Sequence, residues 1–330
     1  MGTVSSRPAR EHAPAGVIDT LGTAFSIVNR RSYLVSVPVL VDVLLWLGPR
    51  LPARELVSSL TSALVRNGAL PGQQGTVLQA LGEEIDLMSV LASSLPSLVS
   101  ALGPQTFAVP YQPPEISVAP LWAALAGVLL FVLGIAISMT YWTLLADIVR
   151  GERFKTRRFA RAAARNTATM LGYLGLVLLG ALGLSFLAGA VLLVATLLGL
   201  ESLVLSLFTI LSVVGALVFY LGTFFVEDAI VMSASGPFRS IGYSIGILRV
   251  AFWPTVRFIA AVTMIQLGLP LALRVFTTNV LAVPFALLSY AYIATGLMVA
   301  SLLYYRERIV SVLRHLSMQA QQERVEERQP

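Results

Sequence analysis

Residues 166–226 read NTATMLGYLGLVLLGALGLSFLAGAVLLVATLLGLESLVLSLFTILSVVGALVFYLGTFFV, and Glu201 is the single charged side chain among them. A membrane-spanning helix needs about 20 mainly apolar residues, so this run is long enough for two crossings. The polar break at 199–202 predicts the turn of a helical hairpin. Strands of a membrane β-barrel alternate apolar and polar residues, and this run does not. Helices are favoured because they satisfy every backbone donor internally, as lipid requires.

The whole chain has the composition of a membrane protein. Of its 330 residues, 56% are apolar and 12% are charged, whereas about 25% of the residues of a soluble domain are charged. The mean hydropathy is +0.80. These values exclude an ordinary soluble enzyme and a disordered protein, and they argue against a nucleic-acid partner despite the formal net charge of +6. The lack of cysteine excludes disulfides, cysteine-bound zinc and thiol nucleophiles. The fold class is therefore expected to be all-α and integral to the membrane.

The distances between successive charges predict six transmembrane helices. They are expected at about 32–48, 119–146, 169–198, 203–226, 254–274 and 283–305. The fifth is short, because only 16 uncharged residues separate Arg257 from Arg274. As a helix they rise about 24 Å. Arginine side chains at the two ends can extend to the lipid headgroups and relieve the mismatch.

Lysine and arginine are unevenly divided between the two sides of this six-span arrangement. The N-terminal segment, the 147–168 loop, the 227–257 stretch and the C-terminal tail hold 19 of them, against four on the other side. Cytoplasmic loops carry the excess of basic residues. Both termini are therefore expected in the cytoplasm, with an N-terminal segment and interfacial helix over 1–31, a membrane domain over 32–305 and a tail over 306–330.

Residues 50–118 form a long insertion on the outer side. Leu56, Leu60 and Leu64 recur at four-residue spacing, which predicts a helix. The insertion could cap the protein for a partner or a substrate. Alternatively, it could rest an apolar helical face on the membrane surface or on the bundle. The C-terminal tail is the other segment expected to reach a protein partner.

Two segments 220 residues apart share one apolar pattern. Each places four apolar residues at spacing i, i+3, i+7 and i+10: Ile18, Leu21, Phe25 and Val28 in the first, and Phe238, Ile241, Ile245 and Leu248 in the second. Both precede an expected span, and the basic stretch 154–167 holds the corresponding place before the third span. The pattern predicts three repeats of an interfacial helix plus a helical hairpin. The alternative is that any interfacial helix on the inner side, placed before a span, has this apolar spacing without being a repeat.

The second segment belongs to a longer pattern. FVEDAIV at 225–231, GPFRSIGYS at 236–244 and LRVAFW at 248–253 resemble the membrane domain associated with bacterial glycerophosphoryl diester phosphodiesterases. They also resemble related stand-alone six-span bacterial membrane families of unknown function. The segment 147–172 fits the same pattern. The phosphodiesterase catalytic domain has no counterpart in this sequence. The resemblance therefore implies a six-span fold in the bacterial cytoplasmic (inner) membrane, and not that activity.

We find no catalytic or metal-binding constellation, so no enzymatic activity, no cofactor and no metal are expected. The two histidines, His12 and His315, lie in the polar tails without a second histidine or a spaced carboxylate. The chain also has no nucleophile elbow and no glycine-rich phosphate loop.

Charged residues inside the spans are the strongest functional candidates, because a charge at the bilayer centre costs roughly 2.5–3.5 kcal/mol on insertion scales. Asp42 lies well inside the first expected span. It is either a proton or cation site between helices, or the partner of a hydroxyl group, an arginine or water. Asp147, Glu227 and Asp228 lie at inner span ends, where we expect an interfacial acid cluster that pairs with nearby cations.

A dense basic cluster follows the second expected span. Its members are Arg150, Arg153, Lys155, Arg157, Arg158, Arg161 and Arg165. Each cation near an anionic leaflet contributes about 1 kcal/mol to binding, so contact with anionic lipid is expected. The same charges could instead serve only to set the topology. Few aromatic residues interleave with them, which disfavours nucleic acid.

Two functions follow from these features. The first is a non-enzymatic scaffold or accessory protein of the inner membrane that contacts anionic inner-leaflet lipid or a partner. The alternative is a transporter or permease for a small solute or a lipid, with a mid-membrane site near Asp42. A transporter predicts a cavity at mid-depth and broken helices, whereas a scaffold predicts a bundle without a continuous polar path.

Overall fold

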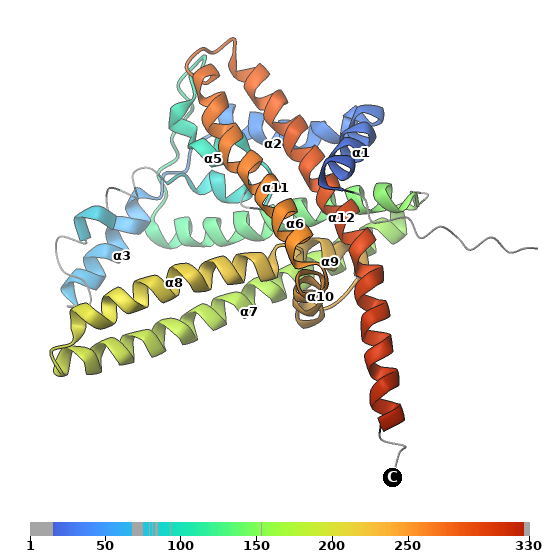
Figure 1. Ribbon diagram of the computed structural model, residues 1–330. Helices are drawn as coiled ribbons and strands as arrows, with labels where there is room; N and C mark the ends of the chain where they lie inside the picture. Colours follow the sequence, from blue (N-terminus) through green and yellow to red (C-terminus); the bar gives the residue numbers. More distant parts are fainter. Residues whose placement is uncertain are drawn as a thin grey trace, which may run out of the picture.

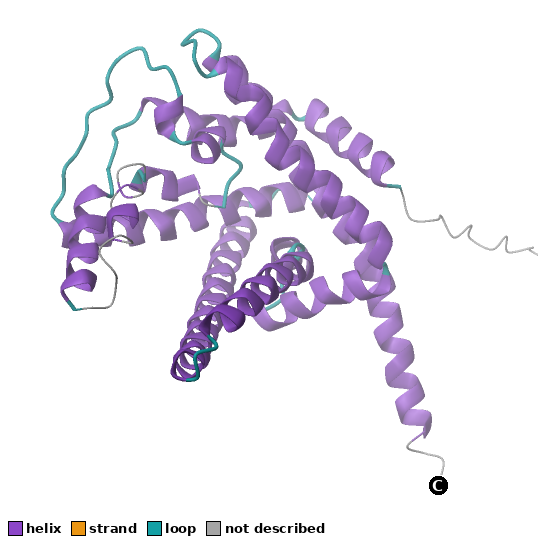
Figure 2. Ribbon diagram, turned by 60° about the vertical axis from the view of Figure 1, so that its left-hand side comes forward, coloured by secondary structure: helices purple, strands orange, loops and turns teal. Residues whose placement is uncertain are grey.

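The computed structural model describes residues 16–326, except 68–74, 79, 81, 83–84, 93 and 153; at Glu201 and beyond Val310 it describes the backbone alone. Over this part of the chain the protein is helical, with no strand (Figure 1, Figure 2). The elements in chain order are α1 (Val17–Arg30), η1 (Ser32–Val35), α2 (Ser36–Leu47), α3 (Arg54–Arg66), η2 (Leu87–Ala92), α5 (Leu98–Leu102), η3 (Pro104–Thr106), α6 (Pro120–Arg150), α7 (Thr156–Leu197), α8 (Glu201–Thr223), α9 (Val226–Ser233), α10 (Pro237–Val250), α11 (Phe252–Leu273), η4 (Arg274–Phe276) and α12 (Val283–Glu326).

Five helices in the described part of the chain are long and apolar enough to cross a membrane. They cover Pro120–Arg150, Thr156–Leu197, Ser202–Ser233, Phe252–Phe276 and Val283–Val310. This agrees with the prediction of an all-α protein that crosses the membrane several times. The first predicted span corresponds to a shorter apolar stretch, Ser32–Leu47, which η1 and α2 share. The sixth crossing therefore stays a prediction.

The long uncharged run folds into the predicted hairpin. α7 ends at Leu197 and α8 begins at Glu201. Between them Gly199 has a φ of +69°, a left-handed conformation that glycine adopts without strain. The two helices project away from α11 and α12 (Figures 1 and 2). Their apolar side chains are largely exposed, as 82% of Phe186 is, which is the surface expected of helices surrounded by lipid.

The helix α12 is the centre of the packed bundle. Its most apolar window is 78% buried, whereas those of α7 and the α8–α9 stretch are 0% buried. It contacts α1, α2, α6, α9, α10 and α11. A Cβ added at Gly296 would lie 2.3 Å from Phe25 Cε1, so a larger residue at this position would displace the Phe25 ring where α12 approaches α1.

The helices α1 and α10 have matching shapes. Each has 14 residues and follows an extended glycine, Gly16 or Gly236. The residue that follows α1, Arg31, has φ −138° and ψ 54°, and the residue that follows α10, Ala251, has φ −135° and ψ 54°. These pairs are 220 residues apart, as in the sequence pattern, so they support a relation between α1–α2 and α10–α11. The basic stretch before the third span is continuous with α7 instead of forming a separate interfacial helix. The threefold repeat therefore stays a prediction.

The insertion 50–118 packs on the bundle. Its helix α5 contacts α2, α11 and α12, and η2 contacts α6. The indole N–H of Trp46 donates to the carbonyl oxygen of Ala108 at 3.0 Å. The N–H of Ala108 in turn donates to the carbonyl oxygen of Thr277 at 2.8 Å. The insertion is thus joined to α2 and to the connection between α11 and α12.

Candidate functional site

Asp42 lies on α2 and is fully buried. Its carboxylate accepts hydrogen bonds from Ser97 Oγ at 2.5 Å and from the backbone N–H groups of Leu98 and Val99 at 3.1 and 3.2 Å. These donors stand at the beginning of α5, where the first N–H groups of a helix have no partner within it. Asp42 therefore anchors the insertion to the first apolar helix. Its partners in the structure are one hydroxyl group and two backbone N–H groups.

The basic cluster lines a cavity of about 770 Å³, which we call the basic cavity. It lies between the end of α6, the beginning of α7 and the end of α9. Its cationic side chains are Arg150, Lys155, Arg157, Arg158, Arg161 and Arg165. The seventh predicted member, Arg153, lies outside the described residues. Asp147 and Glu152 add two carboxylates to the lining.

Two of these cations are engaged within the protein. Arg150 donates to two backbone carbonyl oxygens at the end of α9 and pairs with Asp147 at 3.2 Å. Arg158 pairs with Glu152 at 2.7 Å. The last carbonyl groups of a helix have no partner within it, so Arg150 satisfies them and fixes the end of α9.

The other four cations are exposed and form no ion pair with any side chain that the structure describes. They are Lys155, Arg157, Arg161 and Arg165. Both carboxylates of the basic cavity are already paired, so the positive charge of these four side chains is not compensated there. An arginine guanidinium matches the oxygens of a phosphate group in a two-pronged hydrogen bond. The arrangement can therefore bind an anionic group, and a phosphate ester in particular.

The three predicted acids are divided between two cavities. Asp147 lines the basic cavity and pairs with Arg150 there. Glu227 and Asp228 lie in the first turn of α9 and line a second cavity of about 270 Å³, which we call the acidic cavity. Within the described part of the chain, neither of these two forms an ion pair. The short helix α9 thus presents its first turn to one cavity and its last residues to the other.

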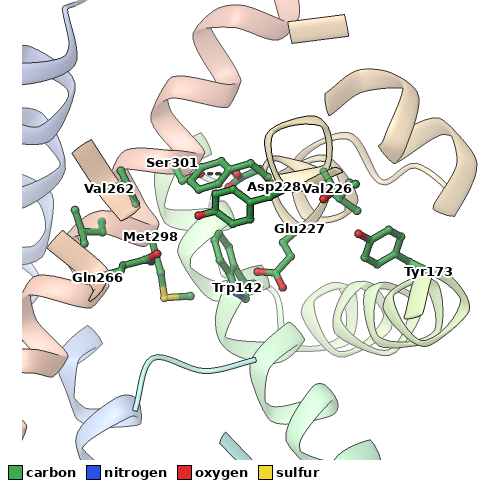
Figure 3. A pocket seen from close by; sticks show the side chains of 13 residues that line it. Trp142, Tyr173, Val226, Glu227, Asp228, Val262, Gln266, Met298 and Ser301 are labelled. Carbon is green, nitrogen blue, oxygen red and sulfur yellow. Dashed lines mark hydrogen bonds between the residues drawn. The ribbon is translucent and has the colours of Figure 1, made fainter. Parts of the chain in front are cut away.

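The helix α9 is the second half of a discontinuous helix. The apolar stretch Ser202–Ser233 is interrupted at Phe224 and Phe225, between α8 and α9. The N–H of Phe225 donates to Ser244 Oγ at 3.2 Å. Its ring is buried and stacks on one aromatic ring of α11 and one of α12. Packing therefore holds the interruption in place, and the first turn of α9 lies against the acidic cavity (Figure 3).

The sequence indicates the two acids of the acidic cavity but not the other residues that line it. Trp142, Tyr173 and Gln266 come from α6, α7 and α11. Each lies in a long apolar stretch, where the pattern does not distinguish a residue that lines a cavity from one that faces lipid. A polar glutamine in the middle of a span is the one signal that could have drawn attention to this place.

Comparisons with known proteins found no match: no protein-family model, no curated protein and no solved structure matches the chain. The resemblance to the membrane domain associated with bacterial glycerophosphoryl diester phosphodiesterases therefore stays a prediction. The two cavities alone carry the functional interpretation.

Proposed function

We propose that this chain is a non-enzymatic accessory protein of the bacterial inner membrane that binds the anionic headgroup of an inner-leaflet phospholipid in the basic cavity. The observation that carries the proposal is a set of four cations that form no ion pair with any described side chain: Lys155, Arg157, Arg161 and Arg165. The cavity volume of about 770 Å³ is within the range of pockets that hold organic ligands. A phosphodiester carries one negative charge and several oxygens that can accept the arginine hydrogen bonds.

An apolar cavity beside the cations favours a lipid over a soluble phosphate ester. It has a volume of about 460 Å³, and its lining includes Leu144, Phe154 and Phe159. Different residues of α6 and of the stretch 154–159 line this cavity and the basic cavity. A phospholipid that places its phosphate among the cations would therefore find an apolar surface for its acyl chains on the same segments.

The predicted six-span topology puts the basic cavity at the inner leaflet, where this ligand would be found. With both termini in the cytoplasm, the connection between α6 and α7 is cytoplasmic, as the excess of basic residues predicts. The four exposed cations of the basic cavity then lie at the level of the inner-leaflet headgroups, where each contributes about 1 kcal/mol to the attraction of anionic lipid.

Native mass spectrometry of the delipidated protein, titrated with phosphatidylglycerol or phosphatidylcholine, tests the proposal. We expect selective retention of phosphatidylglycerol, and a loss of about tenfold or more in affinity when R157Q and R161Q are combined, because about 2 kcal/mol of attraction is removed. The matched control combines R66Q and R274Q, which remove the same charge from the opposite side of the six-span topology, and it should retain the lipid like the unsubstituted chain.

Three results would contradict the proposal. They are equal retention of both lipids, unchanged retention by the R157Q/R161Q protein, and displacement of the lipid by sn-glycerol 3-phosphate at comparable concentration. Displacement by sn-glycerol 3-phosphate would show that the basic cavity binds a soluble phosphate ester.

Solute transport is a second candidate, and the discontinuous helix is the observation that favours it. Transporters commonly place their substrate sites beside interrupted membrane helices. Both oxygens of Asp42 accept hydrogen bonds from the insertion, so Asp42 gives this candidate little support. The interruption at Phe224 and Phe225, beside the acidic cavity, supports it instead.

A further inference from the structure

The acidic cavity carries an inference that does not depend on the lipid site. Residues of α6, α7, α8, α9, α11 and α12 line it, and its volume is about 270 Å³. Figure 3 shows the carboxyl group of Glu227 between the side chains of Trp142 and Tyr173, with Asp228 beside Ser301. Six helices thus converge on two carboxyl groups in a space large enough for a small molecule.

Two buried polar atoms in this lining have no hydrogen-bond partner in the described part of the chain. Asp228 is fully buried; its Oδ2 accepts from Ser301 Oγ at 2.6 Å, but its Oδ1 has no partner. Trp142 is 7% exposed, and its Nε1 has no partner either. A buried polar atom without a partner is unfavourable, because it has lost its hydrogen bonds to water. The lining therefore offers one acceptor and one donor to a ligand.

The two carboxyl groups of the cavity favour a cationic ligand over an anionic one. Glu227 is partly exposed and Asp228 is adjacent to it in sequence. No cationic side chain lines the cavity among the residues that the structure describes. Carboxyl groups in such low-dielectric surroundings interact with an opposite charge more strongly than they do in water. A positively charged ligand would compensate both acids at once.

The aromatic walls favour an organic cation over a metal ion. The rings that line the cavity belong to Trp142, Tyr173, Tyr220 and Phe224. Aromatic faces attract ammonium groups and are the usual recognition surface for quaternary ammonium ligands. A metal site needs several oxygen, nitrogen or sulfur ligands, and no group of three His, Cys, Asp or Glu residues within the described ranges could hold a metal ion.

We propose that the acidic cavity binds a small organic ammonium ion that also carries a hydrogen-bond acceptor. The ammonium group is placed against Glu227 and Asp228 and between the aromatic rings, and the acceptor faces the indole N–H of Trp142. Choline has both features: a quaternary ammonium group and a hydroxyl oxygen.

Equilibrium binding of tritiated choline to the full chain tests this proposal. The protein is held in maltoside micelles, because their headgroups carry no ammonium group. We expect saturable binding, and competition by the neutral isostere in which carbon replaces nitrogen (3,3-dimethylbutan-1-ol) that is weaker by about tenfold or more, because the isostere lacks the charge. Absence of saturable choline binding, or equal competition by the neutral isostere, would overturn the proposal.

Single substitutions assign the binding to this cavity. E227Q should weaken choline binding about tenfold or more, since a charged partner is lost while the shape is kept. The matched control is E115Q, which neutralises an exposed carboxylate of the outer insertion and should bind choline like the unsubstituted chain. Unchanged binding by E227Q, or an equal loss in E115Q, refutes the assignment.

Trp142→Phe separates a ligand contact from a general loss of folding. It removes the N–H but keeps an aromatic ring, so it should weaken choline and leave tetramethylammonium, which has no acceptor, unchanged. A variant that lost both ligands while it remained folded by circular dichroism would contradict the role given to the indole N–H.

Discussion

Replacing Asp42 with alanine should destabilise the folded protein by roughly 3 kcal/mol, because three buried donors lose a charged acceptor. The donors are Ser97 Oγ and the N–H groups of Leu98 and Val99. They stand at the beginning of α5, which joins the insertion to α2, α11 and α12. We therefore expect the insertion to be released before the rest of the bundle unfolds. Limited trypsin digestion in micelles should show earlier cleavage after Arg66, and thermal unfolding should show a lower midpoint.

The control for this experiment is Glu115→Ala, which removes an exposed carboxylate from the same insertion. Its midpoint should remain close to that of the unsubstituted chain, because substitutions at such positions usually change stability by less than about 0.5 kcal/mol. If Asp42→Ala left both the unfolding midpoint and the trypsin pattern unchanged, Asp42 would not anchor the insertion. Its interpretation as an ion site would then regain support.

Replacing Phe225 with alanine should have a similar or larger effect, about 3–5 kcal/mol, the usual cost of removing a fully buried phenylalanine side chain. The ring is 0% exposed and stacks on Phe258 and Tyr304, with centroids 6.2 and 5.6 Å away. It lies at the interruption between α8 and α9 and lines neither the basic nor the acidic cavity. Because α9 borders both cavities, loss of the ring should weaken phosphatidylglycerol retention and choline binding together.

The comparison for Phe225→Ala is Phe225→Leu, which loses the ring but fills more of the buried space than alanine does. Phe225→Leu should lose much less stability than Phe225→Ala and should keep both ligands. The measurements are thermal unfolding in micelles and the two binding assays. An alanine variant with normal binding at both cavities would show that the buried side chain of Phe225 does not hold α9 in position.

The membrane helices and the hairpin could be predicted from the sequence, because lipid imposes a simple requirement. A long run without charges has to be helical, and a single polar break within it has to be a turn. The polar break around Glu201 interrupts such a run, and the structure places the turn of the hairpin there. The basic cavity could be foreseen in part for a related reason, since its cations lie within one short stretch of sequence.

The partners of buried polar groups could not be predicted. Asp42 accepts a hydrogen bond from Ser97, which lies 55 residues later in the chain. The sequence identifies that segment only as an insertion. The acidic cavity needs residues from six helices, and the sequence carries no signal for how those helices meet. The same limit explains why the sequence predicts one cluster for Asp147 and Glu227, although the structure places them in different cavities. Proximity to span ends did not indicate which side of α9 each would face.

The topology determines which leaflet the basic cavity faces, and cysteine labelling tests it most directly. The chain contains no cysteine, so single substitutions at exposed positions provide unique sites: Thr23→Cys in α1, Ser59→Cys in α3 and Val310→Cys in α12. In intact cells a membrane-impermeant maleimide should label only Ser59→Cys, and Thr23→Cys and Val310→Cys should react only after the inner face is exposed. Labelling of Thr23→Cys and Val310→Cys from opposite sides would mean an odd number of crossings and would contradict the six-span account.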